Sequence, residues 1–420
     1  MSGTASPERD LADVCARASS LPVSRELLES MLVLRRELHA APELSNHEVA
    51  TAARLQRALE QAGITEFRSA AGTGFVVDVV GAHEGPTIAL RGDLDALPIT
   101  EELDLPWASR HPGVMHACGH DAHASMLYAA ALALHADREQ LAGTVRCIFQ
   151  PAEEAEPLGG RRIVEEGHLN GVVGAVGIHV DPTLPTGAIG VMPGVYSCAS
   201  DEFDIEVHGV SAHAAKPHEG VDAIAIGAAL VSELQLVAAR EHDPAIPLVI
   251  SVGSFHGGVA YNVLADHVTL GGTIRTADPE LHAFACRRLR DIAEAIAERH
   301  GGSATVSIRH GEPPVVNDRA MVGLISDAAR RLAGQSAVIP EPAWTASDDF
   351  GFYSEAAPSV YFRLGIRPRG SDSAFALHHP RFAVDEDALP LGTAILVEAA
   401  KSFLRPGGDP GRDRSEADDH

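Results

Sequence analysis

The stretch HACGHDAHA, residues 116–124, brings histidines, a cysteine and an aspartate together in one short segment. Thiolate and imidazole groups bind zinc and similar divalent ions, and Gly119 permits a tight backbone path between Cys118 and His120. A C-x-H pattern alone is more often a core cysteine beside a structural histidine. We expect His116 and His123 to brace this loop or to orient a ligand. A metal site therefore needs partners from other parts of the chain.

Further candidate ligands stand at the ends of apolar segments. Glu153 and Glu154 follow TVRCIFQPA, His179 closes VGIH, and His378 and His379 lie in LHHPRF. Adjacent strand residues point to opposite faces, so both glutamates can serve one site only if the chain turns before them. Thiolate, imidazole and carboxylate groups suit zinc or a similar ion, and two ions sharing a water could use five or six such groups. A carboxylate left over could act as general acid and base.

The elements that must position these residues alternate between helices and strands. The patterns predict helices at 25–38, 47–62 and 122–135 and strands at 74–81, 87–95, 144–154 and 176–179. This alternation predicts an α/β domain with a mostly parallel, mixed sheet flanked by helices. Ligand sites in such sheets lie beyond the carboxyl ends of strands, where Asp93, Asp95 and the glutamate pair stand.

The pattern changes after residue 194. Strands at 201–209, 248–258, 267–276 and 303–311 and helices at 222–240 and 279–300 follow the order β-α-β-β-α-β, which predicts a smaller α+β, ferredoxin-like domain. A helix at 321–334 and a strand at 359–365 then resume the α/β style. We therefore predict a catalytic domain, residues 1–193 and 312–404, interrupted by a satellite domain at 194–311. Residues 405–420 are expected to form a disordered acidic tail.

The composition of the chain bears on which partners it can bind and on where in the cell it is expected. A net charge of -25 argues against nucleic acid or an anionic membrane as a partner. No apolar run was found that reaches the roughly 20 residues of a membrane helix, and the N-terminus lacks a secretory signal pattern, so we expect a cytoplasmic protein. Five cysteines without framework spacing predict no disulfides.

Taken together, the motifs resemble the amidohydrolase branch of the metal-dependent aminoacylase and carboxypeptidase superfamily, with its hippurate hydrolases and plant indole-acetyl-amino acid hydrolases. The resemblance covers about residues 28–404 in the branch's own order. One departure is SDDF, residues 347–350, where Gly-Glu-Asp-Phe is usual. The motifs that carry the resemblance are residues 35–48, 91–99, 115–127, 149–154, 177–180, 211–224, 262–276, 347–353 and 377–382.

The resemblance implies a role for each candidate residue. Glu153 would be the catalytic acid and base, Asp95 would orient a ligand, and Asp93 stands where related peptidases carry a metal-binding histidine. His213 would stabilise the oxyanion, in its own subunit or in a partner's, and Asn262 and Arg275 would grip a substrate carboxylate. The metal ligands would be Cys118, His120, Glu154, His179 and His378, the last preferred to His379 for its spacing from Pro380.

The expected activity is hydrolysis of the amide bond of small N-acyl amino acids, with acetyl or hippurate-like acyl groups, in a homodimer or a dimer-based homo-oligomer. Two divalent metal ions would be the cofactors, and zinc, manganese, cobalt and nickel all agree with the sequence. A dipeptidase or carboxypeptidase of the same superfamily is the first alternative. A catalytically silent metal-binding scaffold and a redox role for Cys118 are the others; the intact Glu153 argues against the scaffold.

Overall fold

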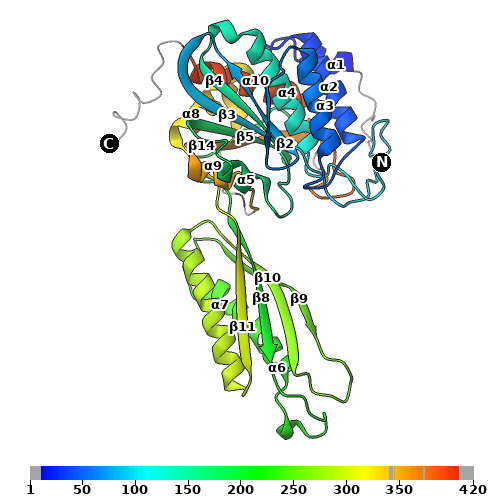
Figure 1. The fold of residues 1–420 in the computed structure, drawn as a ribbon, viewed down its shortest axis with the longest axis vertical. Helices are drawn as coiled ribbons and strands as arrows, with labels where there is room; N and C mark the ends of the chain where they lie inside the picture. Colours follow the sequence, from blue (N-terminus) through cyan, green and yellow to red (C-terminus); the bar gives the residue numbers. More distant parts are fainter. Residues whose placement is uncertain (1–10, 340–343, 345, 372–373, 406–420) are drawn as a thin grey trace, which may run out of the picture. The chain divides into compact units, whose positions relative to one another are not determined.

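The computed structural model describes residues 11–339, 344, 346–371 and 374–405 (Figure 1). Its contacts divide the chain into two compact units. The first unit holds Met1–Gly194, Val316–Pro342 and Phe352–His420, and the second holds Val195–Val315 with Ala343–Gly351. The second unit thus also takes a short segment from the later part of the chain. Most of the expected acidic tail, residues 406–420, lies outside the described residues.

A mixed sheet forms the centre of the first unit and confirms the predicted α/β class. Its strand order is β1-β2-β4-β3-β5-β14-β6-β13. The middle pairs β4·β3, β3·β5 and β5·β14 are parallel, whereas β1·β2, β2·β4 and β14·β6 are antiparallel. The strands of this unit are β1 (Phe67–Ala70), β2 (Gly74–Val80), β3 (His83–Asp93), β4 (Ala142–Gln150), β5 (Val172–Pro185), β6 (Ile189–Gly190), β13 (Val338–Ile339) and β14 (Ser359–Arg367); short strands β7 (Gly194–Val195) and β12 (Val316–Asn317) lie at its boundary with the second unit.

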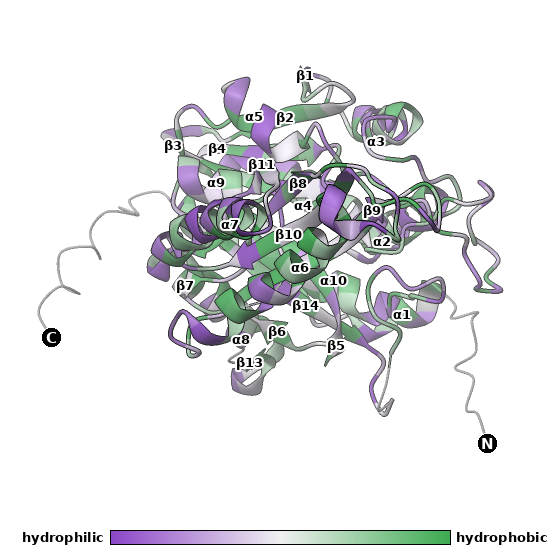
Figure 2. Ribbon diagram, turned by 90° about the horizontal axis from the view of Figure 1, so that it is seen from below, coloured by the Kyte–Doolittle hydropathy of each residue, from purple (hydrophilic) through white to green (hydrophobic). Residues whose placement is uncertain are grey.

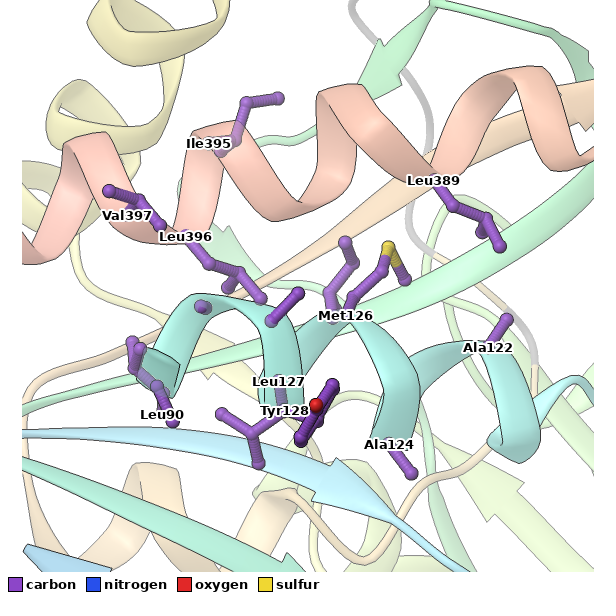
Figure 3. Packing of buried hydrophobic residues seen from close by; sticks show 14 of the residues in the cluster. Leu90, Ala122, Ala124, Met126, Leu127, Tyr128, Leu389, Ile395, Leu396 and Val397 are labelled. Atoms are coloured by element: carbon purple, nitrogen blue, oxygen red, sulfur yellow. The ribbon is translucent and has the colours of Figure 1, made fainter. Parts of the chain in front are cut away.

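Helices flank this sheet, and α4 is the most deeply buried of those that bear on the site. Its alanines, leucines and methionine are apolar around the whole helix, which suits an element packed between β3, α2 and α10. Figure 3 shows Met126 and Leu396 among the side chains packed between α4 and α10. The helices are α1 (Leu11–Arg17), α2 (Arg25–His39), α3 (Val49–Gln61), α4 (His120–Ala136), α5 (Gly159–Glu165), α8 (Arg319–Ala333), α9 (Gly351–Ala356) and α10 (Leu389–Phe403), with 3₁₀ turns η1 (Arg138–Gln140), η3 (Gln335–Ala337) and η4 (Glu386–Ala388).

Four of these helices, α1, α5, α9 and α10, were not predicted. We expected the chain to begin with the helices that are now α2 and α3, but α1 precedes them and packs on α2. Helix α10 was also missed, because eleven of its fifteen residues are buried and its apolar positions show no single-faced pattern. Hydrophobic periodicity predicts helices that expose one face to solvent, but it does not predict a helix that is buried on nearly every side.

The second unit confirms the ferredoxin-like prediction. Its strands pair antiparallel in the order β11-β8-β10-β9, and α6 and α7 pack against each other and against this sheet. Its separate core includes Phe203, Leu230 and Leu289. The elements are β8 (Ala199–His208), η2 (Pro217–Glu219), α6 (Ala223–Arg240), β9 (Leu248–Gly257), β10 (His267–Thr276), α7 (Pro279–Arg299) and β11 (Ser303–Glu312).

Helix α6 is the one helix among the described residues with the length and apolar composition to cross a membrane (Figure 2). The sequence patterns did not single it out as such a candidate. Its side chains Ile226, Leu230, Leu234 and Val237 belong to the core of the second unit. A core helix of a folded domain passes the same test of length and composition, so this feature is weak evidence for a membrane span.

Candidate metal centre

The loop before α4 presents Cys118 and His120 at the carboxyl end of strand β3. His120 is the first residue of α4, and Gly119 before it has φ +93°, a left-handed conformation that favours glycine. A Cβ at Gly119 would lie 2.4 Å from Cγ2 of Val180, so a side chain is also excluded by space. The glycine therefore lets the thiol and the imidazole stand beside β5.

All five predicted ligands come together in the first unit. Cys118 Sγ lies 3.4 Å from His179 Nε2, and His378 Nε2 lies 3.2 Å from Glu154 Oε1. Glu154 Oε1 is in turn 4.0 Å from His120 Nε2. Two triads of donor atoms share the sulfur, each with all its atoms within 4.8 Å of one another. These triads are Cys118, His120 and His179, and Cys118, Glu154 and His378.

Histidines 378 and 379 have different surroundings. His378 has φ +64°, an uncommon conformation for a residue with a side chain, and its backbone N–H donates to Ala117 O at 2.9 Å. This bond ties the segment to the residue before Cys118. The ring of His379 instead stacks on Phe375. His179 differs from expectation in one respect, since β5 continues past it to Pro185 and the histidine lies within the strand.

The chain turns before the glutamate pair, as both residues require. Strand β4 ends at Gln150, and Ala152 has φ +51°. The backbone N–H of Ala152 donates to Glu48 Oε1 at 2.7 Å, which holds the turn in place. Glu153 Oε2 then lies 3.9 Å from His120 Nε2. Sequence reasoning gave no role to Glu48, which is fully buried; only its place in one of the motifs hints at it.

Asp95 joins two of the candidate ligands. Its Oδ1 lies 2.9 Å from His120 Nδ1, and its Oδ2 accepts from the backbone N–H of Glu154 at 2.9 Å and from Ser45 Oγ at 2.7 Å. A carboxylate accepts and does not donate, so Nδ1 of His120 carries a proton, and in the neutral ring Nε2 has the lone pair, which faces the other donors.

Asp93 is held mainly by protein groups. Arg91 forms an ion pair with its Oδ2, and His123 Nδ1 lies 2.7 Å from its Oδ1. His123 Nε2 accepts the backbone N–H of Val180 at 2.9 Å, so both ring nitrogens of this histidine have protein partners. Asp93 Oδ2 lies 3.8 Å from His120 Nε2, which places its charge beside the candidate ligands.

The electrostatics of this cluster suit cations. Burial alone would lower the pKa of His120, but Asp93, Asp95 and Glu154 raise that pKa to about 10. Burial raises the pKa of the Cys118 thiol well above its ordinary value, and Glu154 and Glu153 raise it further. His120 Nε2 is buried and has no hydrogen-bond partner in the described part of the chain. An acceptor-rich pocket that resists a thiolate and leaves an imidazole nitrogen unpaired fits a divalent ion, which would stabilise both.

A buried ionic network holds the start of α4 against α2, and sequence reasoning missed it. Asp121, which follows His120, pairs with Arg35 at 2.8 Å and with His39 at 2.8 Å. Arg35 also pairs with Glu386 at 3.3 Å. His116, expected to brace the loop before α4 or to orient a ligand, is buried, and neither of its ring nitrogens has a hydrogen-bond partner among the described residues. The RREL motif, residues 35–38, was quoted for its resemblance, yet polar residues buried on a helix give no periodic signal.

The remaining candidates lie in the second unit, at two different ends of its sheet. His213 and Asn262 are neighbours, since His213 bridges Val263 and Ala214 N–H donates to Asn262 O. Arg275, near the end of β10, donates to Ser347 Oγ at 3.1 Å. At about 3.3 Å per residue, Arg275 lies about 25 Å along the strand from its first residue, His267. Within one chain, Asn262 and Arg275 therefore stand too far apart to grip the same carboxylate.

Known proteins resemble nearly the whole chain. The sequence profile of peptidase family M20/M25/M40 matches residues 89–402. A protein named uncharacterized hydrolase y4tI from Sinorhizobium fredii is 46% identical over 90% of this chain and 94% of its own length. N-acetyl-L-cysteine deacetylase of Bacillus subtilis is 39% identical over 92% of each chain.

A solved structure agrees in fold. The YxeP protein of Bacillus subtilis, described as a dinuclear metal binding peptidase from the M20 family, superposes with a TM-score of 0.80 at 34% identity. The match covers 91% of this chain and 99% of that one. Both the sequence and the architecture are thus shared along most of the chain.

Proposed function

The chain belongs to peptidase family M20/M25/M40, whose members are metal-dependent hydrolases, and we propose that it hydrolyses the amide bond of N-acyl amino acids. The observation that carries the proposal is the convergence of five donor side chains around Cys118, with Glu153 beside them. The names of the relatives point the same way, since one acts as an N-acetyl-L-cysteine deacetylase and another as an IAA-amino acid hydrolase.

Two divalent ions are proposed because two triads of donors share one sulfur. Cys118, His120, Glu154, His179 and His378 would hold them. When bound, such ions supply positive charge that polarises a carbonyl group and makes a water molecule more acidic. The ions could be zinc, manganese, cobalt or nickel; the thiolate favours the softer members of this series.

Glu153 is proposed to move the proton. It adjoins Glu154, belongs to neither of these two triads, and lies with its Oε2 3.9 Å from His120 Nε2, so its carboxylate stands beside the proposed ions. It would take a proton from the attacking water and deliver it to the leaving nitrogen. Asp95 keeps His120 in the tautomer that binds through Nε2 and fixes the backbone of Glu154, so it is a positioning residue in this scheme.

His213, Asn262 and Arg275 are proposed to bind substrate, and their separation has a consequence for assembly. The oxyanion and the carboxylate of one N-acyl amino acid lie only a few ångströms apart, whereas these residues stand at opposite ends of β10. If both ends contribute, two copies of the chain must supply them. We therefore propose a homodimer, or an oligomer built from it, in which one copy provides His213 and Asn262 and the other provides Arg275.

The test is a panel of substrates with the metal-loaded full chain. Acetyl, benzoyl and indole-acetyl amino acids are compared with dipeptides and with peptides carrying a free carboxyl end. We expect the acyl amino acids to be cleaved fastest. Faster cleavage of dipeptides would replace the proposal with the dipeptidase alternative, and no amide cleavage by a fully metal-loaded chain would overturn both.

Glu153→Gln tests the proton carrier without changing the size of the side chain. We expect kcat to fall by about 10²–10⁴-fold with the metal content unchanged. Glu156→Gln is the matched control, because Glu156 is largely exposed and lies in the same loop. A variant at Glu153 that keeps the wild-type rate would remove this residue from the chemistry.

A cytoplasmic location is proposed as well. All five cysteines are buried and free, which is the usual state in a reducing compartment. Fractionation of the producing cells would check it, and recovery of the chain outside the cytoplasm would contradict it.

A further inference from the structure

A second group of metal-ligating side chains lies wholly within the second unit. Asp201 stands near the start of β8 and His310 near the end of β11, and the two residues are direct partners across the antiparallel pair. His282 and Cys286 lie on α7, four residues apart and therefore on one face of the helix. Helix α7 packs against both strands (Figure 1). Three elements thus bring the four side chains together.

Their donor atoms meet around one carboxylate oxygen. Asp201 Oδ2 lies 2.6 Å from His282 Nε2 and 2.7 Å from His310 Nδ1. Cys286 Sγ lies 3.8 Å from that same oxygen and 3.8 Å from His282 Nε2. The donor atoms of Asp201, His282 and His310 all lie within 4.8 Å of one another. No other residue type would be needed to complete a four-coordinate site.

The cluster is enclosed on one side and open on the other. The side chains of Asp201 and Cys286 are buried, that of His282 is one-quarter exposed, and that of His310 is 67% exposed. The carboxylate of Asp201 and the thiol of Cys286 lie on the buried side of the cluster, and the imidazole of His310 lies on its solvent-exposed side. An ion from solvent could therefore enter past His310 without disturbing the core.

We propose that Asp201, His282, Cys286 and His310 bind a divalent ion of the zinc class, as a structural site separate from the catalytic centre. Two imidazoles, one carboxylate and one thiolate are the donors that four-coordinate zinc takes in proteins, and the two negative charges balance those of the ion. The site adds to the proposed function and does not depend on it, because none of its residues belongs to that centre.

The geometry agrees in part with a tetrahedral site as it stands. With bond lengths of about 2.3 Å to sulfur and about 2.05 Å to nitrogen or oxygen, the ligand separations should be about 3.6 Å from sulfur and about 3.3 Å between nitrogen and oxygen. Cys286 is already at this range, whereas both histidines are closer to Asp201. They lie at hydrogen-bond distance because ring protons occupy the place of the ion, and binding would release those protons and move each ring outward by about 0.7 Å.

The cysteine distinguishes this arrangement from a plain ion pair of histidines and aspartate. A thiol adds little to a charge-assisted hydrogen bond, yet Cys286 is one helical turn from His282 and directed at the same oxygen. Once filled, the site would join the first turns of α7 to β8 and β11. It would stabilise the end of the sheet where Arg275, a proposed substrate-binding residue, pairs with Ser200 of β8.

The first experiment counts metal in the full chain. Wild type, Cys286→Ser, His310→Gln and the control His256→Gln are saturated with zinc, freed of unbound metal and analysed for zinc per chain. His256 lies exposed on β9 of the same sheet and outside the cluster. We expect Cys286→Ser and His310→Gln to hold about one zinc fewer than wild type and His256→Gln to match wild type. Equal zinc in all four proteins would overturn the site.

The second experiment replaces Cys118, the thiol of the candidate metal centre, so that a sulfur ligand elsewhere in the chain can be detected by itself. Cobalt(II) is added to Cys118→Ser and to the double variant Cys118→Ser with Cys286→Ser, and the sulfur-to-cobalt absorption band is recorded. A band in the first protein that disappears in the second supports the site. Absence of the band in the first protein, or its persistence in the second, contradicts it. The zinc count does not use Cys118→Ser, so it decides the question alone if that variant does not fold.

Discussion

Asp95→Asn is the sharpest test of how the candidate metal centre is positioned. The Asp95 carboxylate accepts from His120 on one oxygen and from Glu154 N–H and Ser45 on the other. An amide has one acceptor and one donor end, so it cannot serve both sides. If its oxygen faces His120, the buried N–H of Glu154 meets a donor. If its NH₂ faces His120, the imidazole must accept on Nδ1 and carry its proton on Nε2, the atom needed for the ion.

The magnitude follows from the bond that is lost. A hydrogen bond to a charged group contributes about 1.5–3 kcal/mol, and the same free energy corresponds to about 10–100-fold in a binding constant. We therefore expect Asp95→Asn to bind metal about 10–100-fold more weakly, with kcat regained in part at high metal concentration. The assay is competition of the full chain with a chromophoric chelator, together with kcat at several metal concentrations.

Asp78→Asn is the matched control for this change. Asp78 also accepts several hydrogen bonds, from Arg68 and Arg146, but none of its partners is a candidate ligand. The control should lose stability and keep its metal affinity. If Asp95→Asn binds metal as tightly as wild type, then Asp95 does not fix the ligands, and the argument from the His120 tautomer is refuted.

Three further predictions follow from the same structure. Mixing inactive Glu153→Gln with inactive His213→Ala should restore about a quarter of wild-type activity if copies exchange and one copy serves the other's site, and none if each chain is self-sufficient. Burial raises the pKa of Asp78, but Arg146 and Arg68 lower it below its ordinary value of 3.8, so the ionised group stabilises the fold above that pH and less as pH falls. The free energy of unfolding of the wild type should therefore fall more than that of Asp78→Asn between about pH 5 and 3. Equal acid sensitivity of the two proteins would contradict this. Chelation should abolish hydrolysis and added metal should restore it, whereas activity that ignores chelators would favour the redox role for Cys118.

Much of the fold could be predicted because the exposed elements carry their own patterns. The β-α-β-β-α-β order of the second unit is visible in alternating strands and in the half-charged α7, and the structure has that order. Helix α7 begins after Asp278, whose side chain accepts the Leu281 N–H at 2.7 Å, a start that the sequence signals directly. Helix α10 was missed because a helix buried nearly all round has no polar face to set its period.

The candidate ligands could be named from sequence for a different reason. Cysteine, histidine and glutamate are rare at the ends of apolar strands, so their type and place stand out even when they are far apart in the chain. The residues that hold them do not stand out. Glu48 is one glutamate among many, and only the structure shows that it fixes the turn at Ala152 on which the direction of Glu153 depends.

The cluster around Asp201 could not be predicted from the sequence, because its residues come together only through tertiary structure. His282 and Cys286 have the spacing of ligands on one helix face, but this spacing also occurs by chance, and the sequence alone gave neither residue a role. Their partners come from two strands about eighty residues before and thirty residues after them, and the strand register alone pairs Asp201 with His310. A slip of one residue in that register would turn Asp201 away from α7 and remove the cluster. The register of β8 against β11 is therefore what decides whether these four residues can share an ion.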